Sequence, residues 1–146
     1  MSALTFILVV LVAFIAGVAS VVDERQFHRP LVACTLMGFA LGDPTTGIML
    51  GGALELIALG WMNVGAAMAP DSALASTNSA VVVIQGHQDI TTGIAIAVPL
   101  AAAGQVLTIF VRTITVFFQH QADNFAKTAN FRGIELMHIS GCLLYT

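Results

Sequence analysis

The sequence predicts an all-α, polytopic membrane protein, and its composition and its long uncharged runs lead to that prediction. Hydrophobic residues make up 58% of the 146 residues, charged residues make up 9%, and the mean hydropathy is +0.92. Soluble proteins carry roughly 25% charged residues, so this chain has too few charges to cover a water-exposed surface. Its hydrophobicity also excludes intrinsic disorder, which requires low hydrophobicity and high charge. We therefore expect the chain to fold in a lipid bilayer.

The charge balance and the motifs of the sequence exclude several other functions. Five Lys and Arg stand against eight Asp and Glu, for a net charge of −3, so no basic surface is expected to bind nucleic acid. The histidines and cysteines lack the short spacings of zinc ligands. The sequence contains neither a P-loop nor a GxSxG motif. We expect no enzymatic activity, no catalytic residue, no metal and no cofactor.

The first predicted elements are a spanning helix over 3–22 and a short apolar segment over 30–42. The run 3–22 carries no charge and has about the 20 residues that a helix needs to cross a bilayer. It lacks the positively charged start of a signal peptide, so we expect it to be retained. The run 30–42 follows a charged cluster at 23–29. As a helix it would be about 20 Å long, short of the roughly 30 Å hydrocarbon core, which predicts a re-entrant or broken segment.

A helix is predicted over 43–60, because Asp is a preferred N-cap and Pro is favoured at the first helical position. Gly47, Gly51 and Glu55 are spaced by four residues, so they share one face, and the two glycines would allow another helix to approach closely. Glu55 would lie about 18 Å along this helix. We therefore expect Glu55 near the middle of the membrane.

Glycine and proline interrupt the segment 61–70, which cannot form one regular helix. Asp71 is expected to cap a helix that ends near Gln85, and 86–89 reads as a loop. Asp89 would then cap a second spanning helix over 90–111. Small residues at four-residue spacing form a stripe on that helix, which Gln105 continues: Gly93, Ala97 and Ala101.

Beyond Arg112 the apolar residues of 114–129 fall at steps of three and four, which predicts an amphipathic helix. We expect it to lie in the membrane interface; a cytosolic connecting helix is the alternative. The last apolar run, 138–146, is too short to complete a crossing. We therefore expect the chain to be part of a longer protein.

Polar residues within apolar sequence are the candidates for function, because an ionisable group in a membrane is costly and usually faces a cavity or a helix bundle. Glu55 is either a binding residue or a structural hydrogen-bond partner of a neighbouring helix. Asp71 is either a binding residue or only a helix cap, and Gln105 is expected to join two helices. Broken hydrophobic segments with carboxylates and amides beside the breaks are typical of a transporter site. Such side chains suit the hydroxyl groups of a neutral sugar.

Three stretches resemble one family. They are LGDPTTGIMLGGALELIALGWMNVGAAMAPDSALAS at 41–76, DERQFHRP at 23–30 and AAAGQVLTIFVRTITVFFQH at 101–120. These stretches are similar to the IIC membrane component of the mannose/fructose/sorbose class of the bacterial phosphoenolpyruvate-dependent sugar phosphotransferase system. The mannose-specific IIC proteins of enteric bacteria are the expected nearest relatives.

The resemblance implies a multi-pass protein of the bacterial inner membrane, built from spanning helices, re-entrant hairpins and amphipathic segments. Residues 1–146 would be the N-terminal portion of a single IIC domain, which is considerably longer in the family. The chain would form a hetero-oligomer with a IID membrane subunit. Cytosolic IIA and IIB components would carry the phosphoryl group, so that a bound hexose of the mannose class is phosphorylated by IIB after its passage inward.

The predicted substrate-binding residues are Glu55, Asn63 and Asp71 around the broken helix, followed by Glu24 and Gln26 from the charged cluster. The alternative function is a non-transporting membrane scaffold or an inactive, truncated remnant. A proton- or sodium-coupled carrier is a further alternative, and it would require buried carboxylates that titrate during transport.

Overall fold

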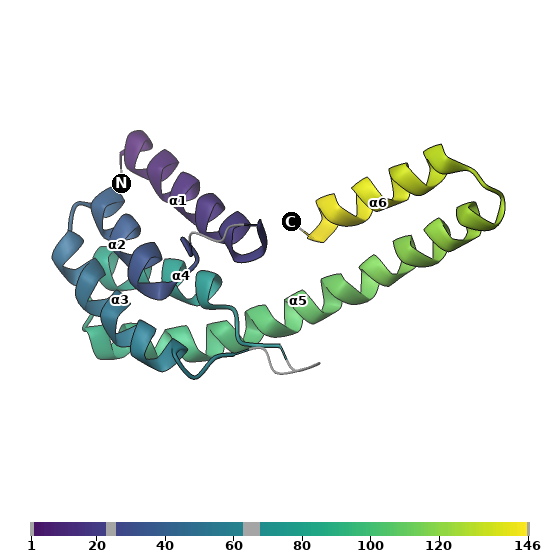
Figure 1. Ribbon diagram of the computed structural model, residues 1–146. Coiled ribbons are helices and arrows are strands. Elements are labelled where there is room, and N and C mark those ends of the chain that lie inside the picture. Colours follow the sequence, from purple (N-terminus) through teal and green to yellow (C-terminus); the bar gives the residue numbers. More distant parts are fainter. Residues whose placement is uncertain (1, 23–25, 63–67, 146) are drawn as a thin grey trace. The chain divides into compact units, whose positions relative to one another are not determined.

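The computed structural model describes residues 2–22, 26–62 and 68–145, and of residue 145 only the backbone. Within these ranges the chain forms six α-helices and no strand (Figure 1), so the all-α prediction is confirmed. The helices are α1 (Ala3–Val22), α2 (Pro30–Leu41), α3 (Pro44–Ala58), α4 (Ser72–Gln85), α5 (Ile90–Lys127) and α6 (Phe131–Tyr145). They form two units, Met1–Gln105 and Val106–Thr146, and α5 contributes to both.

Two helices, α1 and α5, are long and apolar enough to cross a membrane. Most side chains of α1 are exposed, among them Leu4 at 71% and Phe14 at 70%. Its buried residues are Val12, Ala16 and Ala19, which form a single narrow stripe. Exposed apolar surface of this extent is rare on soluble proteins and suits contact with lipid. The helix α1 has the bounds predicted for the first spanning segment.

The short apolar run 30–42 and the helix after it form a hairpin of two helices, α2 and α3. The turn begins at Gly42, whose φ of 87° lies in the left-handed region that glycine adopts without strain. Asp43 then caps α3, because its side chain accepts hydrogen bonds from Thr46 N at 3.1 Å and from Thr46 Oγ1 at 2.6 Å. The predicted start of this helix is confirmed, and neither arm of the hairpin is long enough to span a bilayer.

The glycine stripe of α3 is the surface that faces α2. A Cβ on Gly47 would lie 2.5 Å from the carbonyl oxygen of Cys34, and a Cβ on Gly51 would lie 2.9 Å from Leu31 Cα. Real Cβ atoms do not approach other atoms so closely. Close packing of backbones across small residues is how membrane helices associate without a hydrophobic driving force. The predicted helix approach at these glycines is therefore confirmed, with α2 as the partner.

The helix α4 packs against α1, α2 and α3 within the first unit. Three of its hydroxyl residues are buried and bonded to carbonyls of their own helix: Ser76 Oγ donates to Ser72 O at 2.7 Å and Thr77 Oγ1 donates to Ala73 O at 2.8 Å. Ser79 Oγ donates to Ser76 O at 3.2 Å. These local bonds satisfy hydroxyl groups in an interior where unpaired ones would be costly.

The first part of α5 packs on this unit through the predicted stripe of small residues. Gly93, Ala97, Ala101 and Gly104 are its buried positions. A Cβ on Gly93 would lie 2.5 Å from Val83 Cγ2 and 2.9 Å from Leu50 Cδ1. The helix α5 then continues to Lys127 without a break, so the two segments predicted at 90–111 and 114–129 are one helix. No glycine or proline follows Gly104 before Lys127, which explains why the helix continues.

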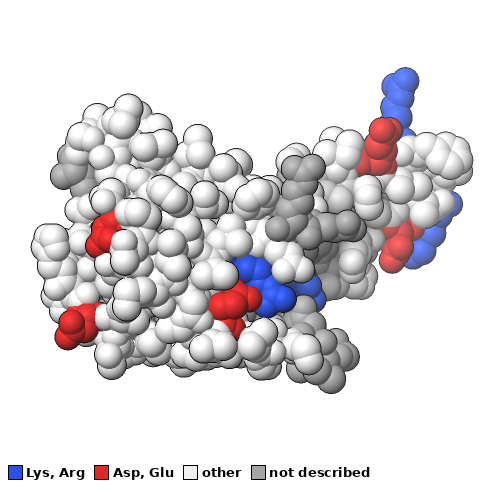
Figure 2. All heavy atoms as spheres, turned by 60° about the vertical axis from the view of Figure 1, so that its left-hand side comes forward, with Lys and Arg blue, Asp and Glu red and all other residues white. Residues whose placement is uncertain are grey.

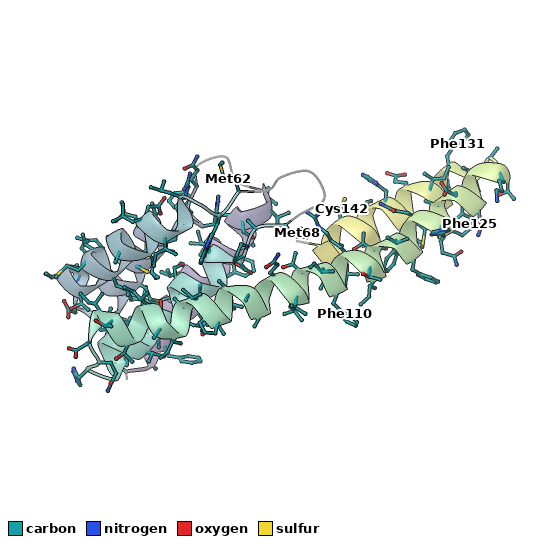
Figure 3. The ribbon with its side chains drawn as sticks, turned by 90° about the horizontal axis from the view of Figure 1, so that it is seen from below. Met62, Met68, Phe110, Phe125, Phe131 and Cys142 are labelled. Atoms are coloured by element: carbon teal, nitrogen blue, oxygen red, sulfur yellow. The ribbon has the colours of Figure 1, made fainter. Side chains whose placement is uncertain are left out.

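The second unit contains the remainder of α5 and α6, which run side by side as a hairpin (Figures 1 and 3). Asn130 precedes α6 and accepts a hydrogen bond from Gly133 N at 3.2 Å. Gly133 faces the Phe125 ring closely, since a Cβ there would lie 2.7 Å from Phe125 Cγ. Phe125 and Phe118 of the predicted amphipathic face are thus half-buried, whereas Phe117 on the same face is exposed. The placement of this face in the membrane interface stays a prediction.

Candidate functional site

Polar side chains gather where α2 and α4 begin. The turn 26–29 leads into α2, Glu55 lies in the last turn of α3, and Asp71 precedes α4. Ser72 Oγ donates to the carbonyl oxygen of His28 at 3.4 Å, which brings the starts of α2 and α4 together. Elements that are far apart in sequence thus meet at one end of the hairpin, opposite its turn at Gly42.

Glu55 is bonded to the beginning of α2 through both oxygens of its carboxylate. Oε1 pairs with Arg29 Nη1 at 2.9 Å, and Oε2 accepts a hydrogen bond from Leu31 N at 3.2 Å. The first N–H groups of a helix have no partner within the helix, and α2 has no side-chain cap of its own. Glu55 supplies that partner. The structural alternative, a hydrogen bond to a neighbouring helix, is therefore confirmed, and a role in binding stays a prediction.

Arg29 joins Glu55 to a second predicted binding residue, Gln26. Arg29 Nε donates to Gln26 Oε1 at 3.2 Å, and Gln26 begins the turn with a φ of 62°. The side chains of Arg29 and Glu55 are 37% and 22% exposed, so a polar ligand can reach the pair. Figure 2 shows acidic and basic side chains adjoining in this way on a largely uncharged surface.

Sequence reasoning did not select Arg29 or His28 as site residues. The signal was present, since both lie in the charged cluster at 23–29, but which residue they meet depends on the path of the chain. The Nδ1 atom of His28 is buried and has no hydrogen-bond partner in the described part of the chain. A buried polar atom without a partner is uncommon in native proteins. His28 is therefore a further polar residue to consider at this end of the hairpin.

Asp71 is the N-cap of α4, because Oδ1 accepts a hydrogen bond from Leu74 N at 3.0 Å. Its backbone N–H donates to Ala101 O of α5 at 3.1 Å. A Cβ on Gly104 would lie 2.7 Å from Asp71 Cβ, so α5 and the start of α4 are in close contact. The cap role is confirmed. A carboxylate has about four acceptor positions, so the cap bond does not prevent Asp71 from binding a ligand as well.

Gln105 holds the segment that precedes this cap, since Nε2 donates to Met68 O at 2.5 Å. The sequence predicted that Gln105 joins two helices; instead it joins α5 to Met68, which lies in the non-helical segment before α4. Two further predicted binding residues, Glu24 and Asn63, lie outside the described residues, and their assignments stay predictions. Among the described residues, no three His, Cys, Asp or Glu lie close enough together to hold a metal ion.

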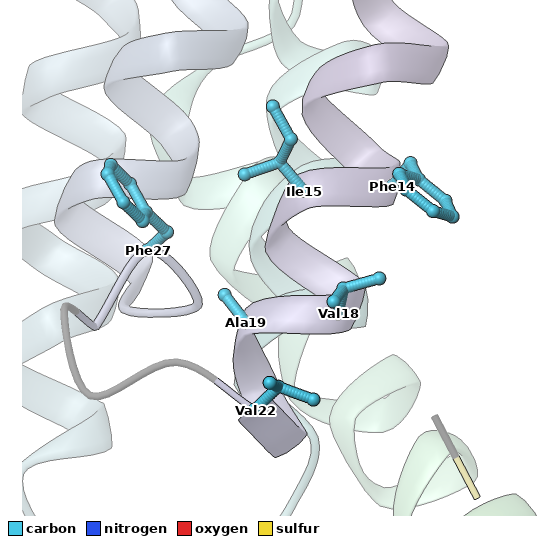
Figure 4. Close-up of a pocket in the computed structure, with 6 residues that line it drawn as sticks. All are labelled: Phe14, Ile15, Val18, Ala19, Val22 and Phe27. Carbon is cyan, nitrogen blue, oxygen red and sulfur yellow. The ribbon is translucent and has the colours of Figure 1, made fainter. Parts of the chain in front are cut away.

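A separate hollow of about 210 Å³ lies beside α1 (Figure 4). It is lined by Phe14, Ile15, Val18, Ala19, Val22 and Phe27. These side chains offer no hydrogen bonds, whereas a sugar needs a partner for each hydroxyl group it buries. The polar cluster, and not this hollow, is therefore the candidate site for a polar ligand.

Comparison with known proteins identifies the family. Residues 3–146 match the family model described as the sorbose-specific IIC component of the PTS system. The chain belongs to this family. The family membership confirms the resemblance carried by 41–76, 23–30 and 101–120, and it makes the chain a membrane protein of the IIC permease class.

Relatives specific for different sugars are similar to this member of the family to nearly the same degree. The fructose permease IIC component of Bacillus subtilis is 66% identical and covers 96% of this chain. The sorbose-specific EIIC component of Klebsiella pneumoniae is 65% identical over 95%, and the mannose-specific EIIC component of Escherichia coli is 62% identical over 97%. These identities do not single out one hexose.

A solved structure supports the fold. The cryo-EM structure described as the mannose transporter ManYZ in complex with microcin E492 matches with a TM-score of 0.86 at 61% identity. The match covers 99% of this chain and 58% of that one. The chain spans about half the length of the curated relatives, between 52% and 53% of those named above.

Proposed function

We propose that this chain is the N-terminal portion of a sugar-translocating IIC subunit, and that it binds a neutral hexose at the cluster formed by Gln26, Arg29, Glu55 and Asp71. The observation that supports this most directly is the network in which Arg29 bonds both Gln26 and Glu55. It brings an amide and a carboxylate together at the start of α2 and the end of α3, in a chain of a sugar-permease family.

The chemistry of the cluster suits a polyol. Arg29 donates a hydrogen bond to the side-chain oxygen of Gln26. The side-chain N–H groups of Gln26 can then donate to a hydroxyl oxygen of the sugar. The carboxylates of Glu55 and Asp71 accept hydrogen bonds from hydroxyl groups, and hydrogen bonds to charged groups are worth about 1.5–3 kcal/mol. Asn63 and Glu24 would complete the set from the adjoining segments.

The proposal extends to partners and location. A IID membrane subunit would complete the transporter. The name of the similar solved transporter, ManYZ, fits a transporter made of two components. Cytosolic IIA and IIB components would deliver the phosphoryl group, and the assembly would lie in the bacterial inner membrane as a multi-pass hetero-oligomer. In this scheme the chain transports the sugar and leaves phosphoryl transfer to its partners.

Uptake measurements test the proposal. The complete protein, with its IID, IIA and IIB partners, is expressed in a bacterial host that lacks mannose-class transporters, and uptake of labelled mannose, fructose and sorbose is followed. We expect uptake of at least one hexose that requires phosphoenolpyruvate and persists with an uncoupler. No uptake by a stably inserted complex would favour the scaffold or remnant. Uptake abolished by the uncoupler would favour a proton- or sodium-coupled carrier.

A further inference from the structure

The hollow beside α1 is a groove that follows the last turns of a helix long enough to cross a membrane. Five of its six lining residues lie on α1, from Phe14 to Val22, and Phe27 forms the opposite side (Figure 4). In a helix the rise from Phe14 to Val22 is about 12 Å. Phe14 and Val22 are 70% and 64% exposed, so the groove opens outward.

The chemistry of the groove suits hydrocarbon and excludes water. A buried water needs two to four polar partners, and all six lining side chains are apolar. The groove has a volume of about 210 Å³, whereas an apolar cavity of roughly 150 Å³ already stays dry and takes up benzene. An empty groove would leave its lining without dispersion contacts. Its expected content is therefore an apolar molecule.

The groove has the depth and the direction of an acyl chain in one leaflet of a bilayer. The three residues directly after Val22 are Asp, Glu and Arg, and charged groups are costly in the hydrocarbon core. Val22 therefore lies near the headgroups, and Phe14 lies deeper. The hydrocarbon core is roughly 30 Å thick, so one leaflet supplies about 15 Å. The groove, about 12 Å long, covers most of that depth.

We infer that the groove between α1 and Phe27 binds one acyl chain of a membrane phospholipid and retains it while the surrounding lipids exchange. The acyl chain enters at the level of Val22 and Phe27 and extends toward Phe14. Phe27 belongs to the turn that carries Gln26 and Arg29 into α2, so the bound chain packs against that turn. The inference rests on the membrane family of the protein and does not depend on the proposed sugar site.

Two tryptophan substitutions at adjacent residues separate filling of the groove from a change elsewhere on α1. Val18 lines the groove and is half-buried, so the indole of Val18→Trp occupies the space of the acyl chain. Gly17 does not line the groove, and a Cβ there would meet no atom within 4 Å. Gly17→Trp therefore adds the same side chain to the same helix and leaves the groove open.

The experiment uses a phospholipid whose acyl chain carries a photoreactive diazirine. The complete protein and its IID partner are produced in membranes that contain this lipid. The complex is extracted into detergent, which removes exchanging lipids, and is then illuminated; labelled peptides are mapped by mass spectrometry. Residues 14–27 should carry at least about fivefold more label than residues 4–11, because a chain enclosed on two sides keeps more contacts than one on an open helix face.

The variants and the reference segment decide the outcome. Val18→Trp should lower the label on 14–27 at least about fivefold, since the indole leaves no room for the acyl chain, whereas Gly17→Trp should stay within about twofold. Equal label on 4–11 and 14–27 in the unsubstituted complex would show ordinary lipid contact and overturn the inference, even if no variant assembles. Absence of label from 14–27 overturns it as well, because a protein segment then covers the groove. Undiminished label in an assembled Val18→Trp complex, or an equal loss in both variants, also overturns it. No sugar enters the measurement, so the result is independent of the proposed function.

Discussion

Replacing Gly51 with alanine tests whether the close contact between α2 and α3 holds the candidate site together. A Cβ at this position would lie 2.9 Å from Leu31 Cα and 3.0 Å from Pro30 O, and both atoms belong to the backbone. Ordinary contact begins near 3.4 Å, so α2 must move by about 0.5 Å. Overpacking of this kind costs about 1–3 kcal/mol. The movement also displaces Leu31 N, which Glu55 binds.

Gly52 provides a control one residue away. A Cβ there would meet no atom within 4 Å, and alanine is the better helix former by about 1 kcal/mol. We expect Gly51→Ala to lower the thermal unfolding temperature in detergent and to weaken hexose binding. Gly52→Ala should leave hexose binding unchanged and unfolding at the same temperature or higher.

The comparison can refute the reasoning. If Gly51→Ala and Gly52→Ala unfold at the same temperature and bind hexose equally, the two arms of the hairpin are not in the tight contact described. If Gly51→Ala loses stability but binds hexose normally, the position of Leu31 and its bond to Glu55 do not matter for the site.

Three further predictions concern the polar residues. Glu55→Gln should remain in the membrane and bind hexose with about 1.5–3 kcal/mol less free energy, because a charged acceptor becomes neutral; equal dissociation constants in equilibrium dialysis would leave Glu55 with a structural role alone. Asn63→Ala and Asp71→Ala should each weaken hexose binding by roughly 1–3 kcal/mol, and the double variant should lose less than the sum. Lower thermal stability of Asp71→Ala by about 1 kcal/mol with unchanged sugar affinity would make Asp71 a cap only. Gln105→Leu should destabilise the protein by about 1 kcal/mol through loss of its bond to Met68 O, which thermal unfolding against the unsubstituted protein measures.

The elements that follow from local chemistry were predictable from the sequence. Asp43 and Asp71 cap helices through N–H groups three residues ahead, so the signal and its partner lie within one turn. The spacing of Gly47 and Gly51 also predicted that another helix approaches one face of α3 closely, because this prediction requires only the size and spacing of the residues.

The network of the candidate site was not predictable in the same way. Arg29 and Glu55 are separated in sequence by α2, a turn and most of α3, and their contact depends on where the hairpin closes. Glu55 stood out in the sequence as a carboxylate within an apolar helix, but its partner at the start of α2 could not be predicted from spacing. The helix predicted over 114–129 is the continuation of the helix predicted over 90–111, because a change in hydrophobic pattern does not by itself interrupt the backbone and neither residue 112 nor residue 113 is a glycine or proline.

The hydroxyl groups of α4 that bond to carbonyls of their own helix determine how α4 is held in the first unit. Ser76, Thr77 and Ser79 donate to carbonyls of their own helix, so these hydroxyls do not tie α4 to its neighbours. At its beginning, by contrast, directional bonds join it to other segments, from Asp71 N to Ala101 O and from Ser72 Oγ to His28 O. Along the rest of α4 a directional bond also comes from another helix, from Cys34 Sγ of α2 to Ser76 O at 3.3 Å. The start of α4, where the sugar is proposed to bind, is therefore held by directional bonds to two other segments, whereas most of its length is held by packing.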